Sequence, residues 1–158
     1  MQGCDVSPAN GESWLEKAMV TIAFLGLVQT IEPLVPKLVW FLESLHKAGL
    51  SSRCIFGENG SSDATRQALE AEDRSDWRIV DTSFMAEIAP RLKRIAYGRQ
   101  KLKDELSQSA WRCDFVCVVD WDVLLAAPPS AEAIADTIKE LETRVDLFAV
   151  SPTSKPTY

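Results

Sequence analysis

AMVTIAFLGLV, residues 18–28, is the stretch that decides the fold, because it is a continuous apolar run without a charged side chain. A strand that is buried on both faces has this pattern, whereas a strand with one wet face alternates apolar and polar residues. A second, nearly all-apolar run, DFVCVV, occupies residues 114–119. Shorter strand-like runs lie at residues 53–57, 77–81 and 147–150. The sequence therefore predicts five strands of a buried sheet.

Helical patterns separate these strands. They cover residues 30–48, residues 61–71 and residues 90–110, and a further helix begins after Ser130. Strands that alternate with helices form parallel sheets covered on both faces, with right-handed crossovers. The predicted fold class is α/β, with a doubly wound, mostly parallel, Rossmann-like sheet. Ligands of such sheets bind beyond the carboxyl ends of the strands.

The 158 residues divide into a flexible polar leader (residues 1–16), one α/β domain (residues 17–151) and a loop-like tail (residues 152–158). No stretch reaches the ~20 apolar residues of a membrane span. The leader also lacks the basic start and apolar middle of a signal peptide. Membrane association is not visible in the sequence. The chain as read is expected in the cytoplasm, or in the Golgi or secretory lumen if an anchor precedes it.

The net charge of −6 argues against nucleic-acid binding, which usually needs a basic face. A small anionic ligand would then need a local basic cluster or a metal ion. The four cysteines form no C-x-x-C pair, and His46 stands at no familiar zinc-ligand spacing from them. We therefore expect buried thiols, and this cysteine usage leans towards a reducing compartment.

Three common enzyme motifs do not occur in this sequence. The residues after the first strand read QTIEP instead of G-x-G-x-x-G, which argues against a dinucleotide dehydrogenase or a Rossmann methyltransferase. There is also no Walker A sequence, and no G-x-S-x-G elbow that would support hydrolase chemistry. The candidate chemistry lies instead in carboxylate and basic side chains near the strand ends.

Asp120 and Asp122 follow directly after the apolar run at 114–119. In an extended segment, residues two apart point to the same side, so these two carboxylates would form an oxygen-rich site for Mn²⁺ or Mg²⁺. Such an ion can neutralise the leaving diphosphate of a nucleotide sugar as a Lewis acid. The alternative is a solvated strand end, in which one aspartate caps the turn towards residues 128–129. Trp121, between the aspartates, is a candidate for stacking on a ligand.

Two more polar groups lie near the predicted ligand edge. The loop at residues 58–65 can turn tightly at its glycine and offer hydrogen bonds to a ribose or base, or it is an ordinary loop before a helix. A basic cluster begins the helix after Pro90, where the helix dipole favours acidic residues. It points to phosphate binding, or to a solvated face that pairs with Glu87, Asp104 or Glu105. The cluster consists of Arg91, Lys93, Arg94 and Arg99.

Three segments together resemble, in order and spacing, the fungal capsule-associated α-1,3-mannosyltransferase family of the GT-A glycosyltransferases. They are ENGSSDAT (58–65), RLKRIAYGRQKL (91–102) and FVCVVDWDVLL (115–125), and the resemblance spans roughly residues 20–150. It departs at Gln100, where the family tends to have asparagine. The resemblance implies a GDP-mannose donor, a glycan acceptor and a divalent metal, Mn²⁺ or Mg²⁺. It implies donor binding by Glu58, Asn59, Gly60, Ser61, Asp63, Arg94, Arg99 and Asp120, and metal binding by Asp120 and Asp122.

These features predict a metal-dependent glycosyltransferase that transfers a hexose, mannose by the resemblance, to a glycan acceptor. GT-A enzymes carry an acceptor-binding half after the D-x-D, and residues 123–158 provide room for one helix and one strand. We therefore expect a sheet truncated after the donor-binding half, with no assigned catalytic base. Two alternatives stay open: a module that binds a nucleotide sugar without transferring it, and a nucleotidyltransferase, whose usual basic glycine-rich loop after the first strand is missing.

Overall fold

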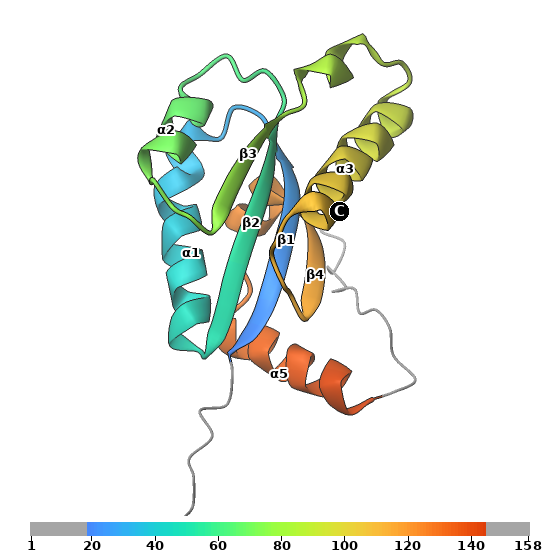
Figure 1. Cartoon of the computed structure of the whole chain (residues 1–158). Helices are drawn as coiled ribbons and strands as arrows, with labels where there is room; N and C mark the ends of the chain where they lie inside the picture. Colours follow the sequence, from blue (N-terminus) through green and yellow to red (C-terminus); the bar gives the residue numbers. More distant parts are fainter. Residues whose placement is uncertain (1–18, 145–158) are drawn as a thin grey trace, which may run out of the picture.

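The computed structural model describes residues 19–144, which form an α/β domain (Figure 1). The elements in chain order are β1 (Val20–Val28), the 3-10 turn η1 (Glu32–Leu34), α1 (Val35–Lys47), β2 (Leu50–Glu58), α2 (Thr65–Ala71), β3 (Trp77–Asp81), the 3-10 turn η2 (Ser83–Glu87), α3 (Arg91–Gln108), β4 (Phe115–Asp120), α4 (Trp121–Ala126) and α5 (Ala131–Thr143). The four strands form one sheet in the order β3-β2-β1-β4, and every pairing is parallel. The predicted fold class is confirmed.

β1 is an inner strand of this sheet, because β2 pairs with one of its edges and β4 with the other. Its residues 22–26 are all buried, as the continuous apolar run predicts. The carboxyl end of β1 lies level with those of its neighbours: Val28 is the partner of Glu58, and Leu27 is the partner of Asp120. The polar residues that end β2 and β4 are therefore brought to one edge of the sheet.

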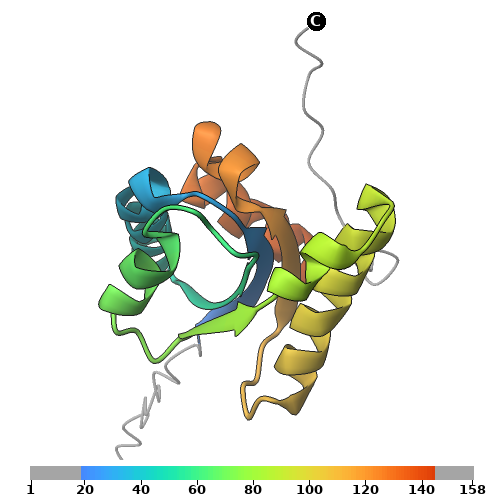
Figure 2. The same ribbon diagram turned by 90° about the horizontal axis from the view of Figure 1, so that it is seen from above.

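Helices cover both faces of the sheet (Figure 2). α1, α2, α4 and α5 lie on one face, and α3 lies on the other. This division follows from right-handed crossovers, since the chain moves in one direction from β1 to β3 and in the opposite direction from β3 to β4. Strand order reverses between β1 and β4. Open α/β sheets bind their ligands at such a switch point.

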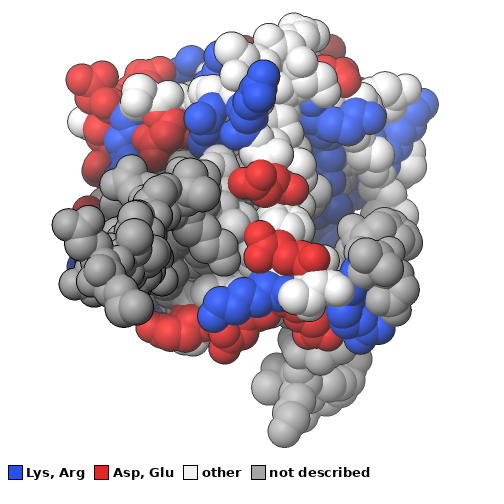
Figure 3. Space-filling view, turned by 60° about the horizontal axis from the view of Figure 1, so that its bottom comes forward, with Lys and Arg blue, Asp and Glu red and all other residues white. Residues whose placement is uncertain are grey.

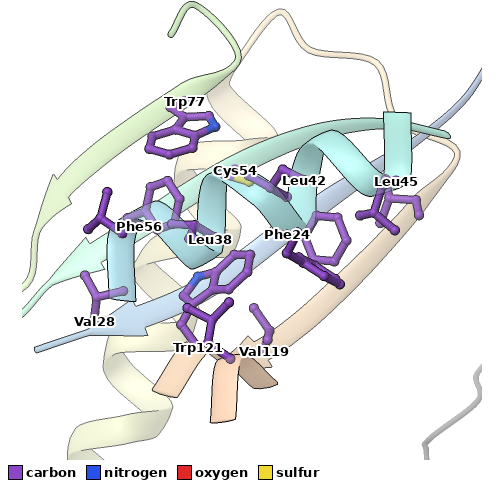
Figure 4. Packing of buried hydrophobic residues seen from close by; sticks show 14 of the residues in the cluster. Phe24, Val28, Leu38, Leu42, Leu45, Cys54, Phe56, Trp77, Val119 and Trp121 are labelled. Carbon is purple, nitrogen blue, oxygen red and sulfur yellow. The ribbon is translucent and has the colours of Figure 1, made fainter. Parts of the chain in front are cut away.

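The larger core lies between the sheet and the helices on the side of α1 (Figure 4). Phe24 of β1 and Phe56 of β2 contact the indole of Trp121, with ring centroids 5.8 and 5.5 Å away. The apolar stripe of α1 closes the cluster, and its helical spacing is the one predicted from the sequence. The buried members labelled in the figure are Phe24, Val28, Leu38, Leu42, Leu45, Cys54, Phe56, Trp77, Val119 and Trp121.

Trp121 is fully buried in this core, so its candidate role as a stacking platform for a ligand is wrong. The helix α4 begins at Trp121 and turns this side chain towards the α1 face. The indole lies against Gly26 of β1, where an added Cβ would clash with it and would come within 2.9 Å of the carbonyl oxygen of Val119. Glycine at this position therefore makes room for the tryptophan.

Most predicted elements are confirmed, and the differences have local causes. The helix expected over residues 30–48 is divided into η1 and α1, each with a proline in its first turn, a position where the missing N–H does no harm. The strand expected at 53–57 is longer at both ends, because it pairs with β1 along its whole length. Ser130 caps α5 as predicted, its Oγ accepting the N–H of Ala133 at 3.1 Å. The predicted leader, tail and strand at 147–150 lie outside the described residues.

β4 is an edge strand within the described part of the sheet. The side chains of Phe115, Cys117 and Val119 pack against the core on the α1 face. Val116 and Val118 alternate with them and are 53% and 55% exposed. The apolar run at 114–119 is therefore only half buried, because α3 packs over β1 and β2 and leaves the neighbouring face of β4 open.

Acidic and basic side chains are interspersed on the face of the molecule that Figure 3 turns forward. No helix within residues 19–144 is long and apolar enough to cross a membrane. The predicted burial of Cys54 is confirmed, and Cys117 is half-buried. Burial raises the pKa of both thiols, and in Cys54 the nearby negative charge of Asp76 raises it further.

Candidate functional site

The carboxyl ends of β2, β1 and β4 form the candidate site. Glu58 and Asp120 end the two strands that flank β1, at nearly the same level of the sheet. Neighbouring strands lie about 4.8 Å apart, so the backbones at these two residues are separated by about 10 Å. Both predicted groups of site residues, the loop after β2 and the aspartates after β4, therefore meet at one edge on either side of β1.

The loop at residues 58–65 is held in shape by its own polar groups. The side chain of Glu58 is buried, and its Oε1 accepts the N–H of Ser61 at 2.6 Å. The N–H of Asn59 donates to the carbonyl oxygen of Val28 at 3.0 Å. Gly60 has φ +64°, a left-handed conformation that glycine adopts without strain. The predicted tight turn is present, and it is the carboxylate of Glu58 that fixes it.

The same loop is tied to the connection between β1 and α1. Three successive N–H groups of that connection donate to side-chain oxygens of the loop: Thr30 to Ser61 Oγ at 3.0 Å, Ile31 to Thr65 Oγ1 at 2.7 Å, and Glu32 to Asp63 Oδ2 at 3.2 Å. In return, Glu32 Oε2 accepts the N–H of Ala64 at 3.2 Å. The side chains of Ser61 and Asp63, which the resemblance assigned to donor binding, thus join the loop after β2 to the connection between β1 and α1.

Asp63 stands just before α2, which begins at Thr65 and not directly after residues 61–63 as expected. Its Oδ1 accepts both the hydroxyl of Thr65 at 2.6 Å and the N–H of Thr65 at 3.0 Å. The hydroxyl bond is the largest cause that lowers the pKa of Asp63, and the N–H bonds from Thr65 and Glu32 lower it further. The ionised carboxylate is therefore the form that holds the two loops together.

We expect the Asp63 carboxyl to titrate below the ordinary aspartate value of about 3.9. A folded-state pKa below the unfolded one stabilises the protein above the unfolded value, and this stability is lost as the pH falls through the folded value. A carboxyl-resonance titration by NMR measures the pKa directly. Thr65→Val removes the hydroxyl donor and should raise it, whereas Thr65→Ser keeps the donor and should leave it low. An equal pKa in both variants would contradict this account.

The two aspartates of the D-x-D do not lie in one extended segment. β4 ends at Asp120, which is the N-cap residue of α4, and Asp122 lies in the first turn of that helix. The expectation that both carboxylates share one side of a strand is therefore wrong, because the chain turns into a helix at Trp121. Within residues 19–144, no group of three or more His, Cys, Asp or Glu side chains is placed to hold a metal ion.

The basic cluster of α3 separates into residues with different contacts. Arg94 donates from Nε to the carbonyl oxygen of Ile88 at 3.2 Å, so it fixes the segment between η2 and α3. Lys93 lies over the ring of Tyr97, 5.8 Å from its centroid. Arg99 reaches the site, where its Nη2 is 3.0 Å from Asp120 Oδ1. Of the two arginines that the resemblance assigned to the phosphates, Arg99 is the one that lies beside the D-x-D.

Two side-chain oxygens next to the site are buried and have no hydrogen-bond partner within the described chain: Asn59 Oδ1 and Thr82 Oγ1. They come directly after β2 and β3. Asn59 was predicted as a site residue, whereas Thr82 was not, because no sequence motif marks it. Buried polar atoms are nearly always hydrogen-bonded in native proteins, so each of these needs an explanation.

No protein-family model matches this chain, and none of the curated proteins matches it. The fold and the edge geometry define its class: a doubly wound α/β domain, with a braced polar loop and an arginine–aspartate pair at the carboxyl edge of its sheet.

Proposed function

We propose that this chain is the donor-binding domain of a metal-dependent glycosyltransferase, which binds a nucleotide sugar at the carboxyl edge of its sheet. The observation that carries the proposal is the contact between Arg99 and Asp120, 3.0 Å apart at the switch point. It places a guanidinium, which suits phosphate oxygens, beside a carboxylate, which suits a hard divalent cation. The transferred sugar is a hexose, and mannose from GDP-mannose is favoured by the resemblance.

The ion pair between Arg99 and Asp120 contributes little to the stability of the fold. The side chains of Arg99 and Asp120 are 44% and 59% exposed, and exposed pairs contribute about 0–1 kcal/mol. Both groups remain open to solvent and to a ligand. A diphosphate can take the guanidinium of Arg99, and a cation can take the carboxylate of Asp120, so the pair would exchange one partner for another when the donor binds.

The carboxylates present fit Mg²⁺ or Mn²⁺ that is shared with the donor. Such ions keep several waters and are often held by one or two carboxylates together with substrate phosphates, so a cage of protein ligands is unnecessary. Asp120 would hold the ion from the end of β4, and Asp122, in the first turn of α4, is the other carboxylate that the D-x-D offers. When bound, the ion supplies positive charge that stabilises the leaving diphosphate.

The loop after β2 supplies the other part of the donor site. The hydrogen bonds of Glu58, Ser61 and Asp63 fix the loop, so its remaining polar groups stand at defined positions before a ligand arrives. Asn59 Oδ1 is buried without a partner, so the side chain would turn towards the ligand to accept an N–H or O–H of the nucleoside. Glu58 and Asp63 therefore act as positioning residues, and Asn59, Arg99 and Asp120 are the contact residues.

Calorimetric titration of GDP-mannose and of UDP-glucose, each with and without Mn²⁺, tests the proposal. We expect binding of GDP-mannose that strengthens when Mn²⁺ is added. Mn²⁺-dependent binding of UDP-glucose alone would keep the site and change the base and the sugar. If neither donor binds in the presence of the metal, the proposed function is wrong for this chain.

A further inference from the structure

The outer side of α3 is basic, although the whole chain has a net charge of −6. Residues 91–103 contain six of the 17 Lys and Arg side chains and no Asp or Glu. The buried residues of this helix are Gly98 and Leu102, so its charged side chains lie on the side away from the sheet. Within residues 19–144, α3 is the one helix on its face of the sheet, so no other described helix covers this side (Figure 2).

Four of these cations have no ion-pair partner within the described part of the chain. All four are exposed, and they are Arg91, Lys93, Lys101 and Lys103. The acidic side chains that the sequence offered as partners have other contacts or none of this kind. Asp104 accepts the Nε2 of Gln100 at 2.6 Å, and Glu105 pairs with Arg78 at 2.8 Å. The basic cluster is therefore not neutralised by its own helix.

Apolar side chains stand among these cations. Leu92 lies between Arg91 and Lys93 and is 81% exposed, more than any other large hydrophobic side chain that the structure describes. Tyr97 is 51% exposed, and Lys93 Nζ lies 5.8 Å from the centroid of its ring. Lys93, Tyr97 and Lys101 are four residues apart, so they form one row along the helix. Single exposed apolar side chains are common, and it is their combination with unpaired cations that distinguishes this surface.

We infer that the outer side of α3 docks on an anionic lipid surface. Clusters of about four to eight Lys and Arg side chains on a helix bind anionic lipid headgroups. An apolar side chain among them, here Leu92, enters the boundary between headgroups and acyl chains. Tyrosine is enriched at this boundary, because its ring is apolar and its hydroxyl is polar.

The shape of the surface favours a lipid bilayer over a peptide as the partner. Peptides bind in grooves or along the edges of sheets, whereas the outer side of a helix is convex. The four unpaired cations, Leu92 and Tyr97 are sufficient for docking, so Arg94 and Arg99 keep the contacts described above. The inference therefore goes beyond the proposed function and does not rest on a donor or on a metal.

Sedimentation of the whole 158-residue chain with lipid vesicles tests the inference. We expect binding to vesicles of phosphatidylcholine mixed with phosphatidylserine, no binding to pure phosphatidylcholine, and loss of binding at high salt. Lys101→Gln should weaken binding about five-fold, the effect of one cation near an anionic membrane. Leu92→Ser should also weaken it, because the apolar anchor is removed. Both side chains are exposed, so circular dichroism should show an unchanged fold.

Two matched variants on α1, which lies on the opposite face of the sheet, serve as controls. Lys47→Gln removes one exposed cation, and Trp40→Ser removes an apolar side chain that is 57% exposed. Neither change should alter vesicle binding, because neither side chain belongs to α3. These controls separate docking through α3 from a general effect of charge or of surface hydrophobicity.

Three results would overturn the inference. In the first, the unchanged chain does not sediment with phosphatidylserine vesicles at low salt. In the second, Lys47→Gln weakens binding as much as Lys101→Gln does, so the effect is not local to α3. In the third, soluble heparin binds as tightly as the vesicles do and Leu92→Ser changes neither affinity. The surface would then be a site for polyanions in general and not for a lipid surface.

Discussion

Replacing Trp121 with alanine is expected to lower the free energy of unfolding by about 3–5 kcal/mol, the usual loss for a large aromatic side chain removed from a core. The indole is fully buried between Phe24 and Phe56, and it lies against Gly26, so β1 cannot move in to fill the space without a large shift. Urea unfolding followed by circular dichroism measures the loss as a lower midpoint with an unchanged slope.

Two matched variants separate the core role of Trp121 from its place in the motif. Trp121→Phe should lose less, because it keeps an aromatic ring and removes an indole N–H that is buried without a partner. Asp122→Ala changes the next residue, which is exposed, and should alter stability by about 0.5 kcal/mol or less apart from a small helix-dipole effect. If Trp121→Ala unfolds at the same midpoint as Asp122→Ala, the described core is wrong.

The sequence D-W-D therefore places a core residue, Trp121, between two aspartates of the candidate site. The tryptophan anchors α4 to the sheet, and this anchor determines where the chain leaves β4. Asp120 is left at the strand end and Asp122 in the first turn of the helix. The D-x-D motif is defined by its aspartates, whereas the packing of this segment depends on Trp121 between them.

Strands and helices were predictable where the side-chain pattern had one explanation. β3 has the predicted bounds, Trp77–Asp81, and β1 ends at the predicted Val28. The apolar run at 114–119 suggested a strand buried on both faces, and only one face is buried. A sequence shows that a strand is apolar on both faces but does not show whether a helix covers each face. Val116 and Val118 are exposed because α3 packs over β1 and β2 and leaves this face of the edge strand β4 open.

The candidate site was predictable in its location and less so in its contacts. Strand order brings the loop after β2 and the end of β4 to one edge, as parallel topology requires. The bond from the N–H of Ile31 to Thr65 joins residues 34 apart, and the Arg99–Asp120 pair joins residues 21 apart. Such contacts depend on register and helix position, which local spacing does not encode.

Asp120→Asn is expected to weaken Mn²⁺-dependent donor binding by at least about 10- to 100-fold, the loss usual even for groups that only support a metal ligand. Asparagine has nearly the same shape and keeps an oxygen for Arg99, so the fold should be unaffected. Calorimetric titration of GDP-mannose with and without Mn²⁺ measures the difference. Asp136→Asn on α5, another exposed aspartate, serves as the matched control and should change nothing.

Arg99→Met gives the complementary result if the pair acts as proposed. The loss of the guanidinium should weaken donor binding both with and without Mn²⁺, because the phosphates lose a direct partner. Asp120→Asn should instead weaken only the part of binding that the metal adds. If the pair were merely a surface ion pair, both variants would bind the donor as the unchanged chain does, and each would change stability by about 1 kcal/mol or less. The comparison therefore distinguishes a donor site from a surface contact, with the same two residues and the same titration.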